Sequence, residues 1–186
     1  MKKFGFIFIV VLCAASIVFA QESKEDRRDA RKARKAEQQR IALENTERLE
    51  KIAATKMFVL EAHTLFGKSG MTYNLNSTTN FVGFDGKNST IQLAFNNLVG
   101  WNGVGGVTLD GSITKMEIKT KEGKPGFTIN ANVLNKAGGL VTMVFRVSAD
   151  GSARVDMSGS FGDRLSFQGY LVALSESRVY KGVPNF

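Results

Sequence analysis

The stretch that decides the fold spans residues 127–151 and reads FTINANVLNKAGGLVTMVFRVSADG. On both sides of Gly138-Gly139, apolar and polar residues alternate, so each flanking run has one apolar and one polar face. Gly-Gly and Asp-Gly pairs are strong hairpin signals, because glycine accepts the positive φ that tight turns require. The stretch therefore predicts two antiparallel strands and a turn that leads into a third.

The same pattern extends in both directions from this hairpin. Asp85-Gly86, Asp110-Gly111 and the loop at residues 122–126 separate further short alternating runs. Tight turns between consecutive strands favour an antiparallel meander, because parallel pairs need long crossovers. The predicted strands are Asn80–Phe84, Ser89–Phe95, Ser112–Thr120, Phe127–Leu134, Leu140–Ser148, Ser152–Ser158 and Arg164–Ala173.

Residues 41–66 carry a helical pattern instead. Their apolar residues fall mainly on one helical face, and Gly67 is a stop signal. We therefore expect a single domain over residues 41–186, with a helix over 41–66 and a β-rich region over 71–174. The expected fold class is mainly β (α+β): a curved antiparallel β-meander, open barrel-like or sandwich, with one N-terminal helix docked on it.

The first twenty residues have the pattern of a cleavable secretory signal peptide. A short basic region at Lys2 and Lys3 precedes an apolar run from Phe4 to Phe19, and small Ala20 follows. The run is shorter than the roughly 20 residues of a membrane-crossing helix. We expect cleavage after Ala20, a periplasmic or secreted product, and no transmembrane span in that product.

Lipid attachment is not expected at Cys13, because Leu12 stands where a small residue is required. Cleavage would remove this sole cysteine, which leaves neither a disulfide nor a thiol nucleophile. It would also remove two lysines and lower the formal net charge from +8 to +6.

Residues 21–40 form a charged lead, which we expect to be helical or disordered because it has no apolar stripe to bury. Clustered basic side chains favour weak contact with anionic surfaces. Those of the lead are Arg27, Arg28, Arg31, Lys32, Arg34 and Lys35.

Six stretches of the sequence share a resemblance to one known family: Phe58–Ala62, Asn80–Gly86, Ile91–Phe95, Gly103–Gly111, Leu165–Leu174 and Ser177–Gly182. They resemble a Gram-negative secreted family, the domain-of-unknown-function family 4251. The resemblance covers residues 56–182 and implies a signal peptide, a charged helical lead and one β-rich domain. It implies no catalytic residues, because the family carries no agreed activity.

The sequence is poorly equipped for catalysis. His63 is the only histidine, so neither a Ser-His-Asp triad nor a histidine metal site is expected. The Gly67-Lys68-Ser69 tripeptide lacks the first glycine of a phosphate-binding loop, since Ala62 occupies that position. We expect no enzyme activity, no metal and no cofactor.

Our leading hypothesis is a non-catalytic binding protein of the periplasm or cell envelope, with a small molecule, a peptide or an envelope component as its ligand. Nucleic acid is not expected, because an exported protein does not meet it. Two alternatives stay open: an envelope-associated structural or interaction protein that acts through the basic lead, and a carboxylate-based hydrolase. The candidate ligand contacts are Trp101, Asn102, Gly103, Gly105 and Gly106, an aromatic side chain beside a glycine-rich bend that also suits close strand packing.

Overall fold

The computed structural model describes residues 4–67, 71–94, 106–136, 138–159 and 164–182. The chain forms two compact units, Met1–Ile41 and Ala42–Phe186. The first unit contains the N-terminal part of the long helix α1 (Phe4–Ala54). The second contains the end of α1 and the β-sheet.

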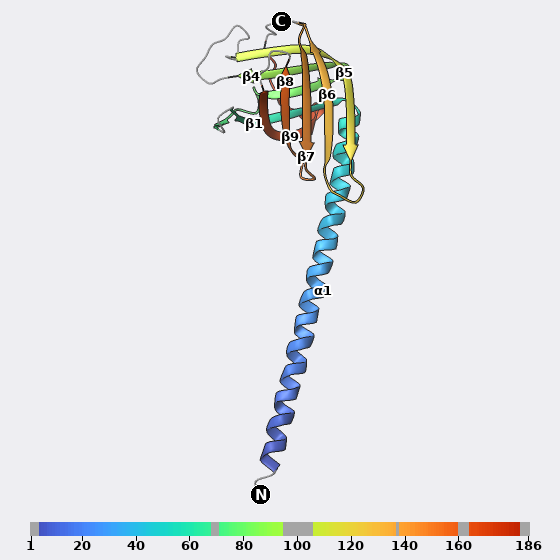
Figure 1. Cartoon of the computed structure of the whole chain (residues 1–186), viewed down its shortest axis with the longest axis vertical. Helices are drawn as coiled ribbons and strands as arrows, with labels where there is room; N and C mark the ends of the chain where they lie inside the picture. Colours follow the sequence, from blue (N-terminus) through green and yellow to red (C-terminus); the bar gives the residue numbers. More distant parts are fainter. Residues whose placement is uncertain (1–3, 68–70, 95–105, 137, 160–163, 183–186) are drawn as a thin grey trace. The chain divides into compact units, whose positions relative to one another are not determined.

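The described strands form one antiparallel sheet that closes into an eight-stranded barrel (Figure 1). From β3 to β9 each strand pairs with the next along the chain, and β1 completes the circle by pairing with both β3 and β9. The ninth strand, β2, extends the sheet beside the end of β1. The strands are β1 (Met57–Phe66), β2 (Thr72–Asn74), β3 (Phe81–Asp85), β4 (Asn88–Ala94), β5 (Gly106–Thr120), β6 (Phe127–Asn135), β7 (Leu140–Val147), β8 (Ser152–Gly159) and β9 (Arg164–Ala173).

The pairing of β1 with β9 closes the barrel. It runs from Phe58 opposite Ala173 to Phe66 opposite Ser166, with a register shift between Ala62 and Thr64. Beside this shift, Gly169 lies so close to β1 that a Cβ atom built on it would stand 1.9 Å from the carbonyl oxygen of Glu61. The closing pair therefore requires glycine at this position.

Aromatic side chains fill the barrel interior near the start of β1. The rings of Phe58 and Phe84 lie 4.7 Å apart between centroids, and Phe145 meets both rings at 6.0 and 5.7 Å. All three side chains are almost completely buried. This packing supplies the stability that a chain with one cysteine cannot draw from disulfides.

The end of α1 packs against the barrel where the β5–β6 and β7–β8 turns lie. Leu49 and Ala53 are buried in the common core. The Thr46 hydroxyl donates to the Ala42 carbonyl oxygen at 2.7 Å and accepts from the Gly126 backbone N–H at 2.9 Å. The helix therefore contacts the sheet through both apolar packing and a hydrogen bond to a turn.

The prediction of a helix over 41–66 is wrong for its second half. The helix ends at Ala54, Lys56 adopts a left-handed φ of 57°, and residues 57–66 form β1 instead. Apolar residues occur on both faces of β1, since buried Val59 lies between the core residues Phe58 and Leu60. This removes the alternation that marks a half-buried strand.

The predicted fold class is confirmed: a mainly β, antiparallel meander with one N-terminal helix docked on it. The seven predicted strands correspond to β3–β9, although β5 begins earlier, at Gly106. Closure of the sheet through β1 and the short strand β2 were not predicted. Within the described residues, no helix has an apolar stretch long enough to span a membrane.

We predict that Gly169→Ala lowers the free energy of unfolding by about 2–3 kcal/mol, because the new methyl group forces β1 and β9 apart. Urea unfolding followed by circular dichroism measures this loss. Gly67→Ala is the matched control, since its nearest atom would lie at an ordinary 3.4 Å. A loss of stability in Gly169→Ala as small as that expected in Gly67→Ala would show that the closing pair tolerates a side chain.

Candidate functional site

The predicted ligand contacts lie mostly outside the described residues. This is true of Trp101, Asn102, Gly103 and Gly105. Gly106 is described and begins β5, where it pairs with Ala94. A Cβ atom at Gly106 would stand 1.9 Å from the carbonyl oxygen of Leu93, so close strand packing accounts for this glycine.

His63 lies in the irregular part of β1, and its Nδ1 is 2.9 Å from the Thr64 hydroxyl oxygen. Its ring centroid is 5.7 Å from that of Tyr170. Among the residues that the structure describes, no group of three or more His, Cys, Asp or Glu side chains is placed to hold a metal ion. The described part of the chain therefore offers polar and aromatic groups rather than metal ligands.

A polar groove of about 410 Å³ lies on the outer wall of the barrel, over β7, β8 and β9. Most of its side chains alternate with the core residues of the same strands and therefore point away from the interior, whereas Met157, a core residue, and its strand partner Leu165 share the inward register. We call it the arginine groove. Its lining residues are Thr142, Val144, Arg146, Asp156, Met157, Ser158, Arg164, Leu165 and Ser166.

Asp156 organises the arginine groove. Its carboxylate accepts hydrogen bonds from Arg146, from Arg154 Nε at 3.4 Å and from the Ser166 hydroxyl. Burial by itself raises the pKa of Asp156, but the hydrogen bonds from Ser166 and Arg146 outweigh it, so the pKa is lowered. Asp156 therefore stays ionised at neutral pH and holds two guanidinium groups in place.

An aromatic ring holds Arg154 from the other side. The Arg154 guanidinium carbon lies 4.2 Å from the centroid of the Phe66 ring, a cation–π contact. Tyr170, two positions beyond the strand pair of Arg154 and Gln168, exposes half of its surface. The groove thus continues into a strip with exposed aromatic surface.

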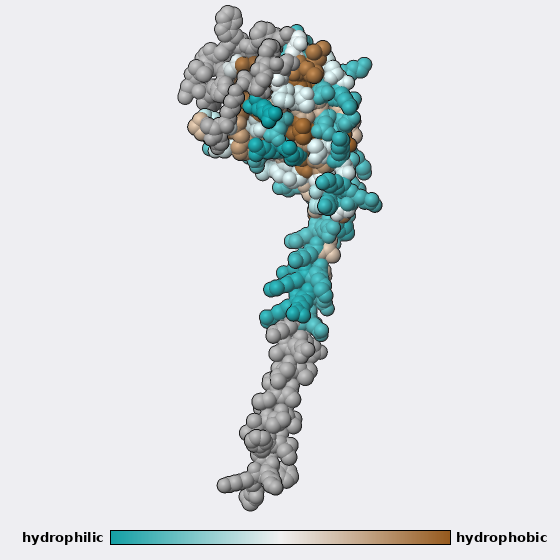
Figure 2. All heavy atoms as spheres, viewed as in Figure 1, coloured by the Kyte–Doolittle hydropathy of each residue, from teal (hydrophilic) through white to brown (hydrophobic). Residues whose placement is uncertain are grey.

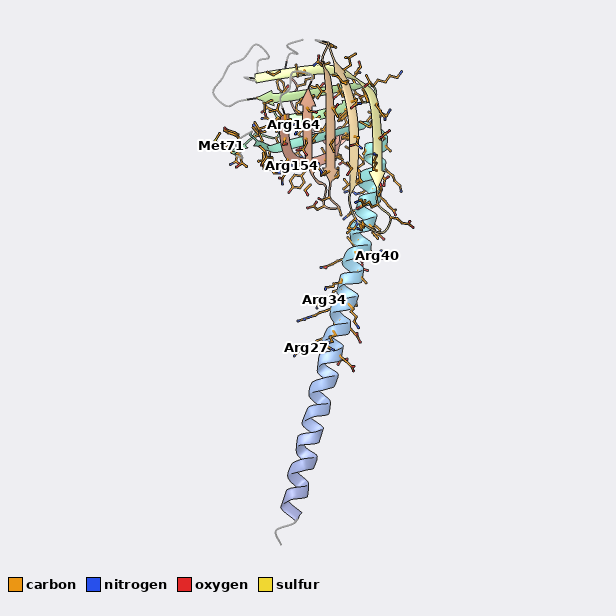
Figure 3. The ribbon with its side chains drawn as sticks, in the orientation of Figure 1. Arg27, Arg34, Arg40, Met71, Arg154 and Arg164 are labelled. Carbon is orange, nitrogen blue, oxygen red and sulfur yellow. The ribbon has the colours of Figure 1, made fainter. Side chains whose placement is uncertain are left out.

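The groove carries a local excess of positive charge. Among the residues that the structure describes here, Arg146 and Arg164 line the groove and Arg154 adjoins it, with Asp156 as the one acid; Arg146 and Arg154 pair with this acid. Figure 3 shows Arg154 and Arg164 on the same side of the barrel, and Figure 2 shows hydrophilic side chains gathered on that side. Each guanidinium has five N–H donors, so those not used by Asp156 are free to meet an anion.

The sequence analysis missed these arginines, although one signal was available. Arg146 and Arg154 stand four residues on either side of Asp150, at the predicted Asp150-Gly151 turn, and a tight hairpin places such positions side by side. The structure pairs them directly, Arg146 opposite Arg154. The position of Arg164 could not be predicted, because it depends on the pairing of β8 with β9.

The fold and the groove together define the class: a small antiparallel β-barrel domain with a helix packed on it and a basic polar groove outside. The chain belongs to the DUF4251 family, a domain of unknown function, whose family model matches residues 41–171. This confirms the resemblance found in the sequence.

A solved structure agrees with this assignment. The chain is similar to the crystal structure of a DUF4251 family protein from Bacteroides eggerthii DSM 20697, with 26% sequence identity and a TM-score of 0.59. The similarity covers 72% of this chain and 90% of the other. No curated protein matches the sequence.

We predict that Asp156→Asn lowers the free energy of unfolding by up to about 1 kcal/mol at pH 7, the usual scale of a half-exposed ion pair. Because the pKa of Asp156 is lowered, its contribution is present above the unfolded value of about 3.9 and is lost as the pH falls through the folded value. Urea unfolding at pH 7 and at about pH 2 measures the change.

The wild type and the variant should therefore converge in acid. Asp29→Asn, on the exposed helix, serves as the control that should not change barrel stability at either pH. A difference between wild type and Asp156→Asn that persists unchanged at the lower pH would show that the carboxylate charge is irrelevant.

Proposed function

We propose that this protein is a non-catalytic, exported binding domain whose arginine groove binds an anionic polysaccharide of the cell envelope or its surroundings. The observation that carries the proposal is the pair Arg146 and Arg154, which are held on either side of Asp156 and face solvent. The proposal of export rests on the signal-peptide pattern of residues 1–20.

The charge of the groove favours an anion, and its geometry favours an extended one. Guanidinium groups fixed by an acid and by an aromatic ring lose little entropy when they bind carboxylate or sulfate groups. The groove lies along three neighbouring strands of an outer wall, which suits a chain-like ligand better than an enclosed small molecule.

Hydroxyl groups of the protein and an exposed aromatic ring favour a sugar ligand over a simple anion. Thr142, Ser158 and Ser166 line the groove and supply neutral hydrogen-bonding partners for sugar hydroxyls. Tyr170, farther along the outer face of β9 and exposed, offers a flat apolar surface with a polar end. These features support a glycan over a free inorganic ion.

The absence of catalysis is part of the proposal. Asp85 and Asp110 line a common cleft elsewhere on the barrel, which is the arrangement that a carboxylate hydrolase needs. Yet the hydrogen bonds from Lys181 and Thr90 outweigh the effect of burial and lower the pKa of Asp110. A general acid requires a raised pKa, so Asp110 is unsuited to that role.

The test compares two doubly substituted variants. We expect Arg146→Gln with Arg154→Gln to weaken binding of a sulfated or uronic polysaccharide about ten- to hundredfold, because charge-assisted hydrogen bonds are lost. Isothermal titration with heparin and polygalacturonate, with neutral dextran beside them, measures the effect. Added salt should weaken the binding, because it screens exposed charges.

The control is Lys115→Gln with Lys119→Gln, which removes the same charge from β5. These lysines also flank one acid, Glu117, with Lys115 Nζ at 2.8 Å and Lys119 Nζ at 4.0 Å. If the control weakens binding as much, net charge rather than the groove is responsible. Equal binding of dextran would contradict the anionic ligand.

A second candidate function has its own observation, in the first unit. At about 100° per residue, six of the eight basic residues of the lead, all but Lys24 and Arg40, define an arc of about 160° on α1. Arg40 lies on the opposite side, where it pairs with Glu37. Asp26, Asp29 and Glu37 lie outside this arc, although Asp29 pairs with Lys32 at 3.0 Å, and all these side chains are exposed. Figure 2 shows hydrophilic side chains along this part of α1, and in Figure 3 Arg27 and Arg34 project from one side.

This segregation supports an electrostatic contact between the basic face and an anionic lipid surface. Each basic side chain near such a surface contributes about 1 kcal/mol. The helix would lie on the surface rather than insert, since no apolar stripe accompanies the basic face.

We predict that the double variant Asp29→Arg with Arg31→Asp binds anionic vesicles about tenfold more weakly than the wild type, since it disrupts the basic face. Its composition and net charge are unchanged. Sedimentation of the exported form with phosphatidylglycerol vesicles, and with phosphatidylcholine vesicles as the neutral control, measures the loss. Unchanged binding would show that net charge suffices.

A further inference from the structure

The C-terminal segment, residues 177–182, lies across the outside of the barrel and is held mainly through its main chain. The Tyr180 N–H donates to the Thr78 carbonyl oxygen at 2.7 Å. One oxygen of Glu61 accepts from the Arg178 N–H at 3.2 Å and from the Ser177 hydroxyl at 2.8 Å. Contacts of this kind recognise an extended backbone rather than particular side chains.

Gln92 is the centre of this recognition. Its side-chain amide is fully buried; it donates to the Tyr180 carbonyl oxygen and accepts from the Gly182 N–H, both at 2.8 Å. The other two contacts of the amide are inside the barrel wall, with the Thr79 carbonyl oxygen and the Thr108 hydroxyl. A carboxamide has two donors and two principal acceptor sites, so all of them are used.

One side chain of the segment adds a charged contact. Lys181 Nζ lies 2.8 and 2.9 Å from the two carboxylate oxygens of Asp110, which also accepts from the Thr90 hydroxyl. Lys136 Nζ approaches the same carboxylate at 3.9 Å. Asp110 therefore favours a basic side chain at the position before Gly182.

The floor under the segment is apolar and incompletely filled. Val59 and Phe81 are buried on the outer side of β1 and β3, where Leu174 and Val179 come over them. A cleft of about 360 Å³ remains between the segment and the strands. We call the surface formed by Glu61, Val59, Phe81, Gln92 and Asp110 the segment groove.

Removal of the segment would leave the segment groove unsatisfied. Gln92 would lose two of its four hydrogen bonds, and Asp110 its closest cation. Buried polar groups without partners are costly, so the groove favours any occupant that offers the same backbone pattern. An identical segment from another copy offers every one of these contacts.

We propose that the segment groove is an interaction surface for a second copy of this chain, in which the two copies exchange residues 177–182. The link to the barrel is one short 3-10 turn, Leu174–Glu176, between Ala173 and Ser177, both extended. Rotation there moves the segment without breaking a strand pair. Exchanging identical elements is a low-cost route to dimers, because the same contacts form again.

The first experiment supplies the segment as a free peptide. The chain is ended after Glu176 and titrated with a labelled peptide of residues 177–186, with fluorescence anisotropy as the readout. We expect saturable binding, weakened at least about tenfold by Lys181→Glu or by N-methylation of Gly182, since each removes a polar contact. Tyr180→Ala is the control and should bind like the parent, because that side chain is exposed.

The second experiment tests the exchange in the full chain. Two populations labelled with donor and acceptor fluorophores are mixed at high concentration, and energy transfer and light scattering are followed. We expect a concentration-dependent dimer that excess free peptide dissociates. A full chain that stays monomeric at millimolar concentration, while the truncated chain binds the peptide, would overturn the exchange.

A truncated chain that does not fold is replaced by the full chain carrying Lys181→Glu, in which the resident segment is weakened. Peptide binding to this variant supports the segment groove as a separable site. If neither form binds the peptide, the segment is a fixed part of the fold and the proposal is wrong.

Discussion

The close contact between β1 and β9 is the constraint on which the rest of the structure depends. Ala62 faces Gly169 there, and the carbonyl oxygen of Glu61 leaves no room for a Cβ atom. Without this pair the meander from β3 to β9 would be an open sheet with two unpaired edges, and open edges invite association. With it, every inner side chain shares one core, and the outer wall becomes a continuous surface on which side chains from successive strands align.

Much of the fold could be predicted, because it is encoded locally. In β6 to β8 each strand alternates strictly and each turn between them has its glycine, so residue type and spacing were sufficient. The prediction for β1 was wrong for a physical reason. The C-terminal segment, more than 110 residues away in sequence, covers the outer face of this strand, where apolar Val59 stands before the polar Glu61 and interrupts the alternation. No local rule reports such a contact, and the run was therefore assigned to the helix.

The residues of the polar sites also differ in how far their positions could be predicted from the sequence. Arg146 and Arg154 are related by one hairpin, and their proximity follows from the turn that the sequence predicts. Gln92 offered no such signal, because its partners Thr79, Thr108, Tyr180 and Gly182 come from three separate parts of the chain. The glycine-rich bend drew attention in the sequence, yet at Gly106 the glycine is explained by the approach of Leu93.

The two outer surfaces differ in what an occupant would gain. In the arginine groove, Asp156 and Phe66 already hold the Arg154 guanidinium, so a ligand adds charge contacts to side chains that have partners without it. In the segment groove, Gln92 and Asp110 depend on the occupant for their hydrogen bonds. The first surface can stand empty at little cost, whereas the second is stable only when filled. A reversible ligand therefore suits the arginine groove, and exchange of one occupant for an equivalent one suits the segment groove.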